Sequence, residues 1–165
     1  MKKLIILCLT LSLILQGCDK KTSDQFTFAF ITDIHLKPEL NAVEGFKLAI
    51  DTINQINPDF VITGGDLIMD ALNQTYGRAD SLYDLYILES GAFNMPIYNT
   101  MGNHEIFGWN SDDEEIQNHA EYGKKMFENR IGKRYYSFDH KGWHFIILDA
   151  ISKDTNGGYW GKLDN

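Results

Sequence analysis

The chain has 165 residues, of which 44% are hydrophobic and 23% are charged, and its formal net charge is −8. This length and composition suit one globular domain with a core of its own. The excess of acidic residues excludes non-specific nucleic-acid binding, for which Lys and Arg must neutralise phosphates. An acidic protein can still bind a phosphate ester where metal cations supply the positive charge.

The N-terminal residues are predicted to form a secretory signal that is not part of the fold. Lys2 and Lys3 make a basic start, and an apolar run follows at residues 4–15. This run is too short to span a bilayer as a helix. The chain is therefore expected to be secreted across the inner membrane.

A bacterial lipobox is the motif that residues 15–18, Leu-Gln-Gly-Cys, resemble. On this interpretation residues 1–17 are a lipoprotein signal peptide, Cys18 carries the lipid, and residues 18–25 are a polar tether. The expected location is a membrane surface, periplasmic or at the cell surface. A simple signal peptide or a membrane anchor is the alternative.

Strands and helices are predicted to alternate from residue 26 onward. Apolar runs indicate buried strands, and apolar residues at three- and four-residue spacing indicate helices. Asn41 and Glu44 resemble a capping box, and Gly91 is placed to end a helix. The elements expected in chain order are a strand at 26–32, a helix at 41–57, a strand at 59–63, a helix at 76–90, a strand at 96–101, a helix at 119–130, and a hairpin of strands at 135–139 and 143–148. This order predicts an α/β fold with a parallel sheet and a late antiparallel hairpin.

Polar side chains with metal-ligand chemistry follow each of the first three predicted strands. They are Asp33 and His35, then Asp66, then Asn103 and His104. Because ligands bind beyond the carboxyl ends of parallel strands, these side chains are expected to converge. Their mixture of oxygen and nitrogen donors suits Mn, Fe, Zn or Ni rather than Ca or a thiolate site. Two such ions, about 3.5–4 Å apart, can activate a water and stabilise a leaving oxygen.

The blocks Asp-x-His, Gly-Asp and Gly-Asn-His-Glu, in this order and each after a predicted strand, resemble the hallmark of the calcineurin-like metallophosphoesterase superfamily. The resemblance covers residues 26 to about 163. It implies a layered α/β/β/α sandwich, of which this chain holds the N-terminal portion. It also implies a hydrolase of phosphate mono- or diesters that uses a dinuclear metal site and a metal-bound hydroxide.

The resemblance implies a role for each matching residue. Asp33 and His35 would bind the first metal, Asp66 would bridge both, and Asn103 would bind the second. His104 would face the substrate, either as general acid to the leaving group or as a hydrogen-bond donor to the phosphoryl oxygens. Asn103 and His104 would thus also contact the small phosphate-ester substrate.

One position departs from the family pattern close to the site. Met69 stands where the family often has an acidic residue or Arg, so a supporting role for the next residue, Asp70, is not expected. Glu105 is predicted to make local hydrogen bonds rather than bind metal. The remaining histidines, His119 and the pair His140 and His144, are expected to be surface or packing residues.

The family completes its metal shells with histidines from later Gly-His and Gly-His-x-His segments, which these 165 residues do not contain. The domain at residues 26–165 is therefore expected to be truncated at its C-terminus. This leaves an alternative function: a truncated, catalytically incompetent lipoprotein with a binding role or no independent role.

Overall fold

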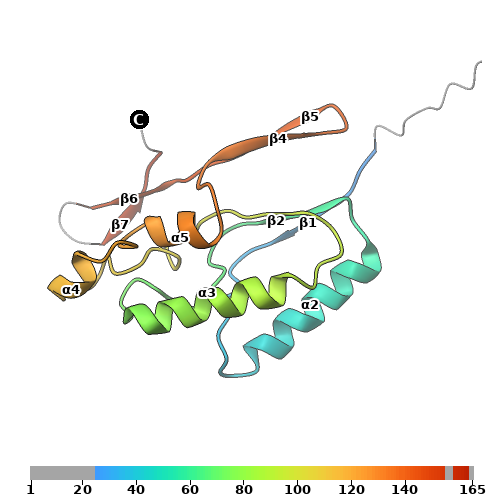
Figure 1. Cartoon of the computed structure of the whole chain (residues 1–165). Coiled ribbons are helices and arrows are strands. Elements are labelled where there is room, and N and C mark those ends of the chain that lie inside the picture. The colour runs from blue at the N-terminus through green and yellow to red at the C-terminus, as the bar shows by residue number, and fades with distance from the viewer. Residues whose placement is uncertain (1–24, 155–157, 164–165) are drawn as a thin grey trace, which may run out of the picture.

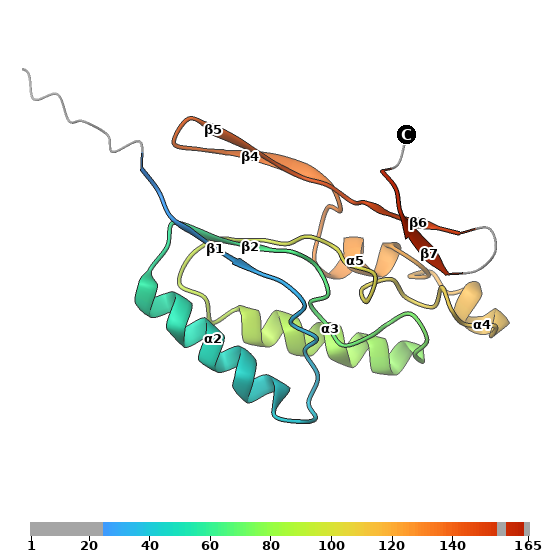
Figure 2. The same cartoon turned by 180° about the vertical axis from the view of Figure 1, so that it is seen from behind.

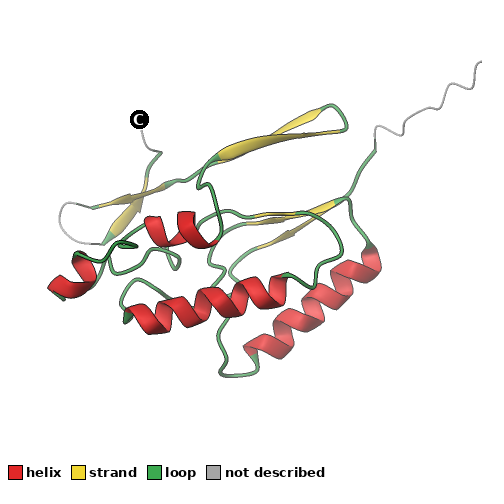
Figure 3. Ribbon diagram, viewed as in Figure 1, coloured by secondary structure: helices red, strands yellow, loops and turns green. Residues whose placement is uncertain are grey.

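The computed structural model describes residues 25–154 and 158–163, so the predicted signal peptide, Cys18 and most of the tether lie outside the described residues. The fold is mixed α/β, as expected (Figures 1 and 3). Its elements are β1 (Phe28–Ile31), α2 (Ala42–Ile56), β2 (Phe60–Thr63), α3 (Tyr76–Ser90), β3 (Ile97–Tyr98), α4 (Glu114–Gln117), α5 (Lys125–Arg130), β4 (Tyr136–His140), β5 (Trp143–Ile147), β6 (Ile151–Lys153) and β7 (Tyr159–Gly161). No helix among the described residues is long and apolar enough to cross a membrane.

The fold has three layers, and the middle one is a parallel sheet of order β1-β2-β3. Helices α2 and α3 cover one face of this sheet, and the antiparallel β4–β5 hairpin covers the other (Figures 1 and 2). The β6–β7 hairpin, which the sequence patterns did not predict, lies beside α4 and α5. The parallel order directs the carboxyl ends of the three strands toward the same edge of the sheet.

The helix side of the sheet holds the larger hydrophobic core. Phe46, Ile50 and Ile53 of α2 are buried, as their spacing predicted. In α3, whose predicted bounds are confirmed, Leu82 is buried, whereas Ile87 is 42% exposed. Burying one such aliphatic side chain contributes about 1.5–3 kcal/mol.

An aromatic cluster joins the sheet to the hairpin. Phe60 of β2 is 1% exposed and lies at its centre. Its ring centroid is 5.2–5.6 Å from those of Phe28, Tyr98, Phe138 and Phe145. Three of these pairs meet edge to face, the arrangement that the charge distribution of aromatic rings favours.

The first strand is less buried than its apolar sequence predicted. Phe28 is 45% exposed and Phe30 is 60% exposed. β1 has only one neighbour in the described sheet, and the hairpin covers β2 more fully than β1. Both features leave β1 side chains exposed.

The third strand is shorter than the predicted range 96–101 and keeps only Ile97–Tyr98. Beyond it, the backbone N–H of Thr100 donates to the side-chain hydroxyl of Thr63 at 3.0 Å, so a side-chain oxygen replaces the ladder carbonyl. With this change of hydrogen-bond acceptor, the chain leaves the sheet just before the Gly102 turn.

The predicted helix at 119–130 forms only over its second half, as α5. Gly123 adopts φ +70° and exchanges two backbone hydrogen bonds with Phe107, which interrupts the helix. The capping box predicted before α2 is also wrong: Asn41 is left-handed, and its side chain accepts no cap hydrogen bond.

The predicted β4–β5 hairpin is confirmed, with a turn at Lys141 and Gly142, both at positive φ. Asp59, which precedes β2, ties this turn to the sheet. Its carboxylate accepts from Lys141 Nζ at 2.6 Å and from the backbone N–H of Thr27 at 3.0 Å. The hydrogen bond from Lys141, supported by those from Thr27 and His140, lowers the pKa of Asp59 to about 2.

An Asp with a lowered pKa stabilises the fold above its ordinary value of 3.8 and loses this effect as the pH falls through about 2. Asp59→Asn is therefore expected to lower the Tm at pH 7, with the difference from wild type narrowing as the pH falls below 3.8. Circular dichroism melts across this range measure it. The control is Asp139→Asn in β4 of the β4–β5 hairpin, because that side chain is 80% exposed. Equal Tm values for Asp59→Asn and wild type at pH 7 would contradict the role of Asp59.

Candidate metal centre

The segments that follow β1 and β2 continue side by side beyond the sheet. Asp33 N–H donates to the Gly65 carbonyl at 3.2 Å, and His35 N–H donates to the Asp66 carbonyl at 3.0 Å. A further bond at 3.0 Å joins Leu36 N–H to the Leu67 carbonyl. The first two predicted blocks are therefore held in fixed register by their own backbones.

The third block approaches the second closely at two glycines. A Cβ added to Gly102 would lie 2.1 Å from Asp66 Oδ1 and 2.3 Å from Asp66 N. Gly65 adopts φ +95°, and a Cβ there would lie 2.7 Å from Gly102 N. Two glycines thus allow this contact, and the His104 N–H then donates to Asp66 Oδ1 at 3.2 Å.

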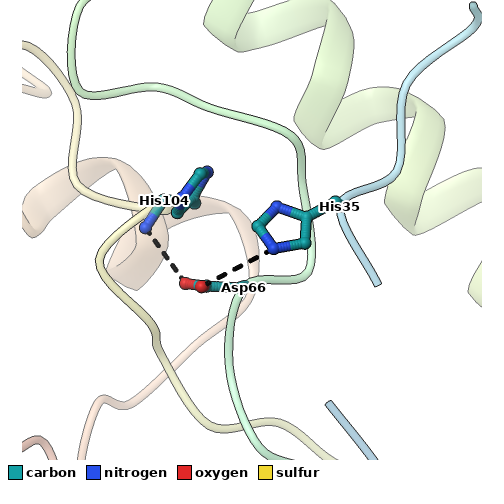
Figure 4. Close-up of side chains that lie close together, drawn as sticks. All are labelled: His35, Asp66 and His104. Carbon is teal, nitrogen blue, oxygen red and sulfur yellow. Dashed lines mark hydrogen bonds and ion pairs between the residues drawn. The ribbon is translucent and has the colours of Figure 1, made fainter. Parts of the chain in front are cut away.

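Three of the predicted site residues form a possible metal-ligand group, namely His35, Asp66 and His104. Each offers a ligand atom, and these atoms all lie within 4.8 Å of one another. Figure 4 shows the Asp66 carboxylate near both histidines, with His35 Nε2 3.9 Å from Asp66 Oδ2. The ring centroids are 4.5 Å apart at 84°. All three residues are half-buried, which leaves the group open to solvent on one side.

The other two predicted ligands belong to the same two segments as His35 and His104. Asp33 Oδ1 is 3.7 Å from His35 Nε2, its other oxygen accepts from the Thr32 hydroxyl at 2.7 Å, and its side chain is 63% exposed. Asn103 is half-buried in the turn between Gly102 and His104, where its carbonyl accepts from the N–H of Ile106 at 3.2 Å. The structure therefore places all five predicted residues at the same edge of the sheet.

Backbone strain accompanies the site. Asp33, His35 and Asp66 adopt φ values of 53°, 47° and 52°, in the left-handed region that residues other than Gly seldom occupy. Such conformations cost on the order of 1–3 kcal/mol each and persist only where surrounding contacts impose them. Strain at three candidate ligands is typical of a functional site.

The two imidazole rings are held differently. His104 Nδ1 makes a short contact with the Met69 carbonyl, so in the neutral ring this nitrogen carries the hydrogen and Nε2 is left with its lone pair. No sequence pattern predicts this contact, because its acceptor is a backbone carbonyl. His35 Nδ1 is buried and has no hydrogen-bond partner among the described protein atoms. The Asp70 carboxylate accepts from Leu72 N–H at 2.8 Å.

Glu105 is 0% exposed and accepts hydrogen bonds as predicted, but three of its four donors, the N–H groups of Asp66, Leu67 and Ile68, are distant in the sequence and only that of Gly102 is local. Complete burial raises the pKa of its carboxyl to about 7, and the charge of Asp66 adds to this rise, whereas hydrogen bonds from backbone N–H groups such as that of Ile68 oppose it. Together with Asp33, these carboxyl groups concentrate acidic character where a divalent cation would neutralise it.

The three remaining histidines lie in other surroundings. The ring of His119 is 4.1 Å from that of Tyr76 and is half-buried. His140 contacts Asp59 at 3.1 Å, and His144 contacts Asp139 at 2.7 Å on the exposed hairpin. Within the described residues, the group around Asp66 is the one set of three or more such side chains placed to share a metal ion.

One comparison with known proteins agrees with this chemistry. A family model described as calcineurin-like phosphoesterase matches residues 26–159. No curated protein matches the chain. Among solved structures, the chain resembles a dimetal phosphatase from Danio rerio at 21% identity and a TM-score of 0.44, over 48% of this chain and 30% of that one.

Gly102→Ala tests the close contact between the two turns. The new Cβ must displace the Asp66 carboxylate, so Mn²⁺ binding measured by calorimetry is expected to weaken about tenfold or more. The matched control is Gly45→Ala in α2, where a Cβ meets no atom within 4 Å and a gain of about 0.5–1 kcal/mol in stability is expected. Unchanged Mn²⁺ affinity in Gly102→Ala would show that the contact does not shape the site.

Proposed function

The chain belongs to the calcineurin-like phosphoesterase family, and from this premise we propose that it binds two divalent metal ions and hydrolyses phosphate mono- or diesters. The observation that carries the proposal is the convergence of His35, Asp66 and His104 within 4.8 Å. The proposed substrate is a small phosphate ester, and the ions are Mn, Fe, Zn or Ni.

The residues present fit such ions. Imidazole and carboxylate donors suit first-row divalent metals, and the buried Nδ1 of His35 lacks a protein partner among the described residues. In the proposed site Asp33 and His35 would hold one ion, Asn103 would hold the other, and Asp66 would serve both. When bound, the ions would supply Lewis-acid polarisation of the phosphoryl oxygens and activation of a water.

We assign His104 to the substrate side of the site. Its Nδ1 contact with the Met69 carbonyl orients the ring, so that Nε2 is the atom available to a ligand. When the ring is protonated, Nε2 donates a hydrogen bond to a phosphoryl oxygen or transfers its proton to the leaving oxygen. The Met69 carbonyl then also stabilises the charged ring, because it accepts the hydrogen on Nδ1. In the neutral ring, Nε2 has a lone pair that could bind a metal ion. Metal binding is therefore the competing role for His104.

Asp66→Ala tests the proposed function. With Mn²⁺ present, a version of the protein that also carries the later Gly-His and Gly-His-x-His segments of the family is expected to hydrolyse a chromogenic phosphate ester, and a chelator or Asp66→Ala should abolish turnover. Asp70→Asn is the matched control, because that carboxylate caps a nearby turn outside the ligand group. Hydrolysis that survives both the chelator and Asp66→Ala would contradict the proposal.

We further propose that Cys18 carries a lipid that anchors the protein to a membrane, periplasmic or at the cell surface. The eight residue-to-residue steps from Cys18 to Phe26 reach at most about 29 Å. The described chain begins at the amino end of β1, beside the β4–β5 turn, whereas the ligand group follows the carboxyl ends of the strands (Figures 1 and 2). An anchor at this end would leave the metal centre directed away from the bilayer.

Cys18→Ser tests the anchor. We expect the variant to move from the membrane fraction to the soluble fraction and to lose incorporation of a labelled fatty acid. Cys8→Ser, within the apolar run at residues 4–15, is the control that should keep both properties. Membrane association and labelling that persist in Cys18→Ser would rule out lipidation at this residue.

A further inference from the structure

One buried carboxylate connects the two turns that hold Asp66 and His104. Glu105 Oε2 accepts from the N–H of Gly102 at 2.6 Å and from that of Asp66 at 3.0 Å. Glu105 Oε1 accepts from Leu67 N–H at 2.7 Å and from Ile68 N–H at 3.1 Å. Four backbone donors from two separate segments therefore converge on a side chain that solvent does not reach.

We propose that Glu105 is a positioning residue that holds the two turns in the metal-binding arrangement before any ion binds. This inference rests on the proposed function and assigns to it a residue that does not itself contact metal or substrate. Oε2 joins one turn to the other, because Gly102 and Asp66 share it. The carboxylate of Asp66 and the backbone of His104 are thereby placed within 3.2 Å of each other.

Direct ligation by Glu105 does not fit the contacts. Both of its oxygens face backbone N–H groups, and the residue is 0% exposed, below the open side of the ligand group. A neutral amide of the same shape does not fit either. In Glu105→Gln one oxygen becomes an NH₂ group, which would face two N–H donors and leave both unsatisfied. Either choice of amide orientation releases one pair of donors.

The neighbouring residue Tyr83 provides a matched control. Its hydroxyl, buried like Glu105, donates to the Glu105 backbone carbonyl at 2.6 Å. Tyr83→Phe removes a buried hydrogen bond to the same residue but leaves the carboxylate and its four donors in place. A general loss of stability is therefore separable from a loss of positioning.

The test measures Mn²⁺ affinity by calorimetry at pH 8, together with the Tm of each metal-free protein. Glu105→Gln is expected to weaken Mn²⁺ binding tenfold to a hundredfold. Tyr83→Phe is expected to lower the Tm and leave the affinity within twofold of wild type. Wild-type affinity in Glu105→Gln, or the same loss of affinity in both variants, would overturn the proposal.

If Glu105→Gln does not fold, amide hydrogen exchange of the metal-free wild type tests whether Glu105 holds the two turns. The amides of Asp66, Leu67, Ile68 and Gly102 are expected to exchange as slowly as those of β2, because the carboxylate already holds them. Rapid exchange of these four amides would overturn the proposal. Failure of the wild type to bind Mn²⁺ would instead contradict the proposed function, while slow exchange would still show the carboxylate holding both turns.

Discussion

The backbone of the turn at residues 64–66 lies against that of the turn at residues 102–104, and the carboxylates of Asp66 and Glu105 connect the two. At Gly102 the space that a Cβ would need is taken by the carboxylate and amide of Asp66. This contact brings His104 to Asp66, and the backbone ladder beyond β1 brings His35 to the other side of the same carboxylate. The arrangement of the ligand group therefore depends on backbone proximity that only glycine allows.

The layers around the sheet impose that proximity. Because β1, β2 and β3 run parallel, their carboxyl ends lie along one edge, and α2 and α3 fix the sheet from one face while the aromatic hairpin fixes it from the other. Hydrophobic burial in these layers offsets the strained φ values of Asp33, His35 and Asp66. The buried carboxylate of Glu105 then satisfies the backbone donors that the turns expose.

Much of this arrangement is predictable from the sequence. Apolar spacing located α2 and α3, and Asp-x-His, Gly-Asp and Gly-Asn-His-Glu after successive strands placed the ligands at one edge. The predicted bounds of the third strand and of the last helix were wrong because contacts between distant segments decide where these elements end. Thr63 takes the N–H of Thr100 and shortens β3, and Gly123 pairs with Phe107 and interrupts the last helix. A backbone carbonyl orients His104, and periodicity carries no information about such an acceptor.

The central claim is that the turns after the parallel strands build a divalent-metal site around Asp66. Crystals of the protein grown with Mn²⁺ and measured for anomalous scattering test it most directly. The account predicts an anomalous peak within coordination distance of Asp66 and His35, at the edge of the sheet opposite the amino end of β1. A well-ordered crystal with no peak there, or with Mn²⁺ bound only at surface carboxylates such as those of residues 112–115, would contradict it.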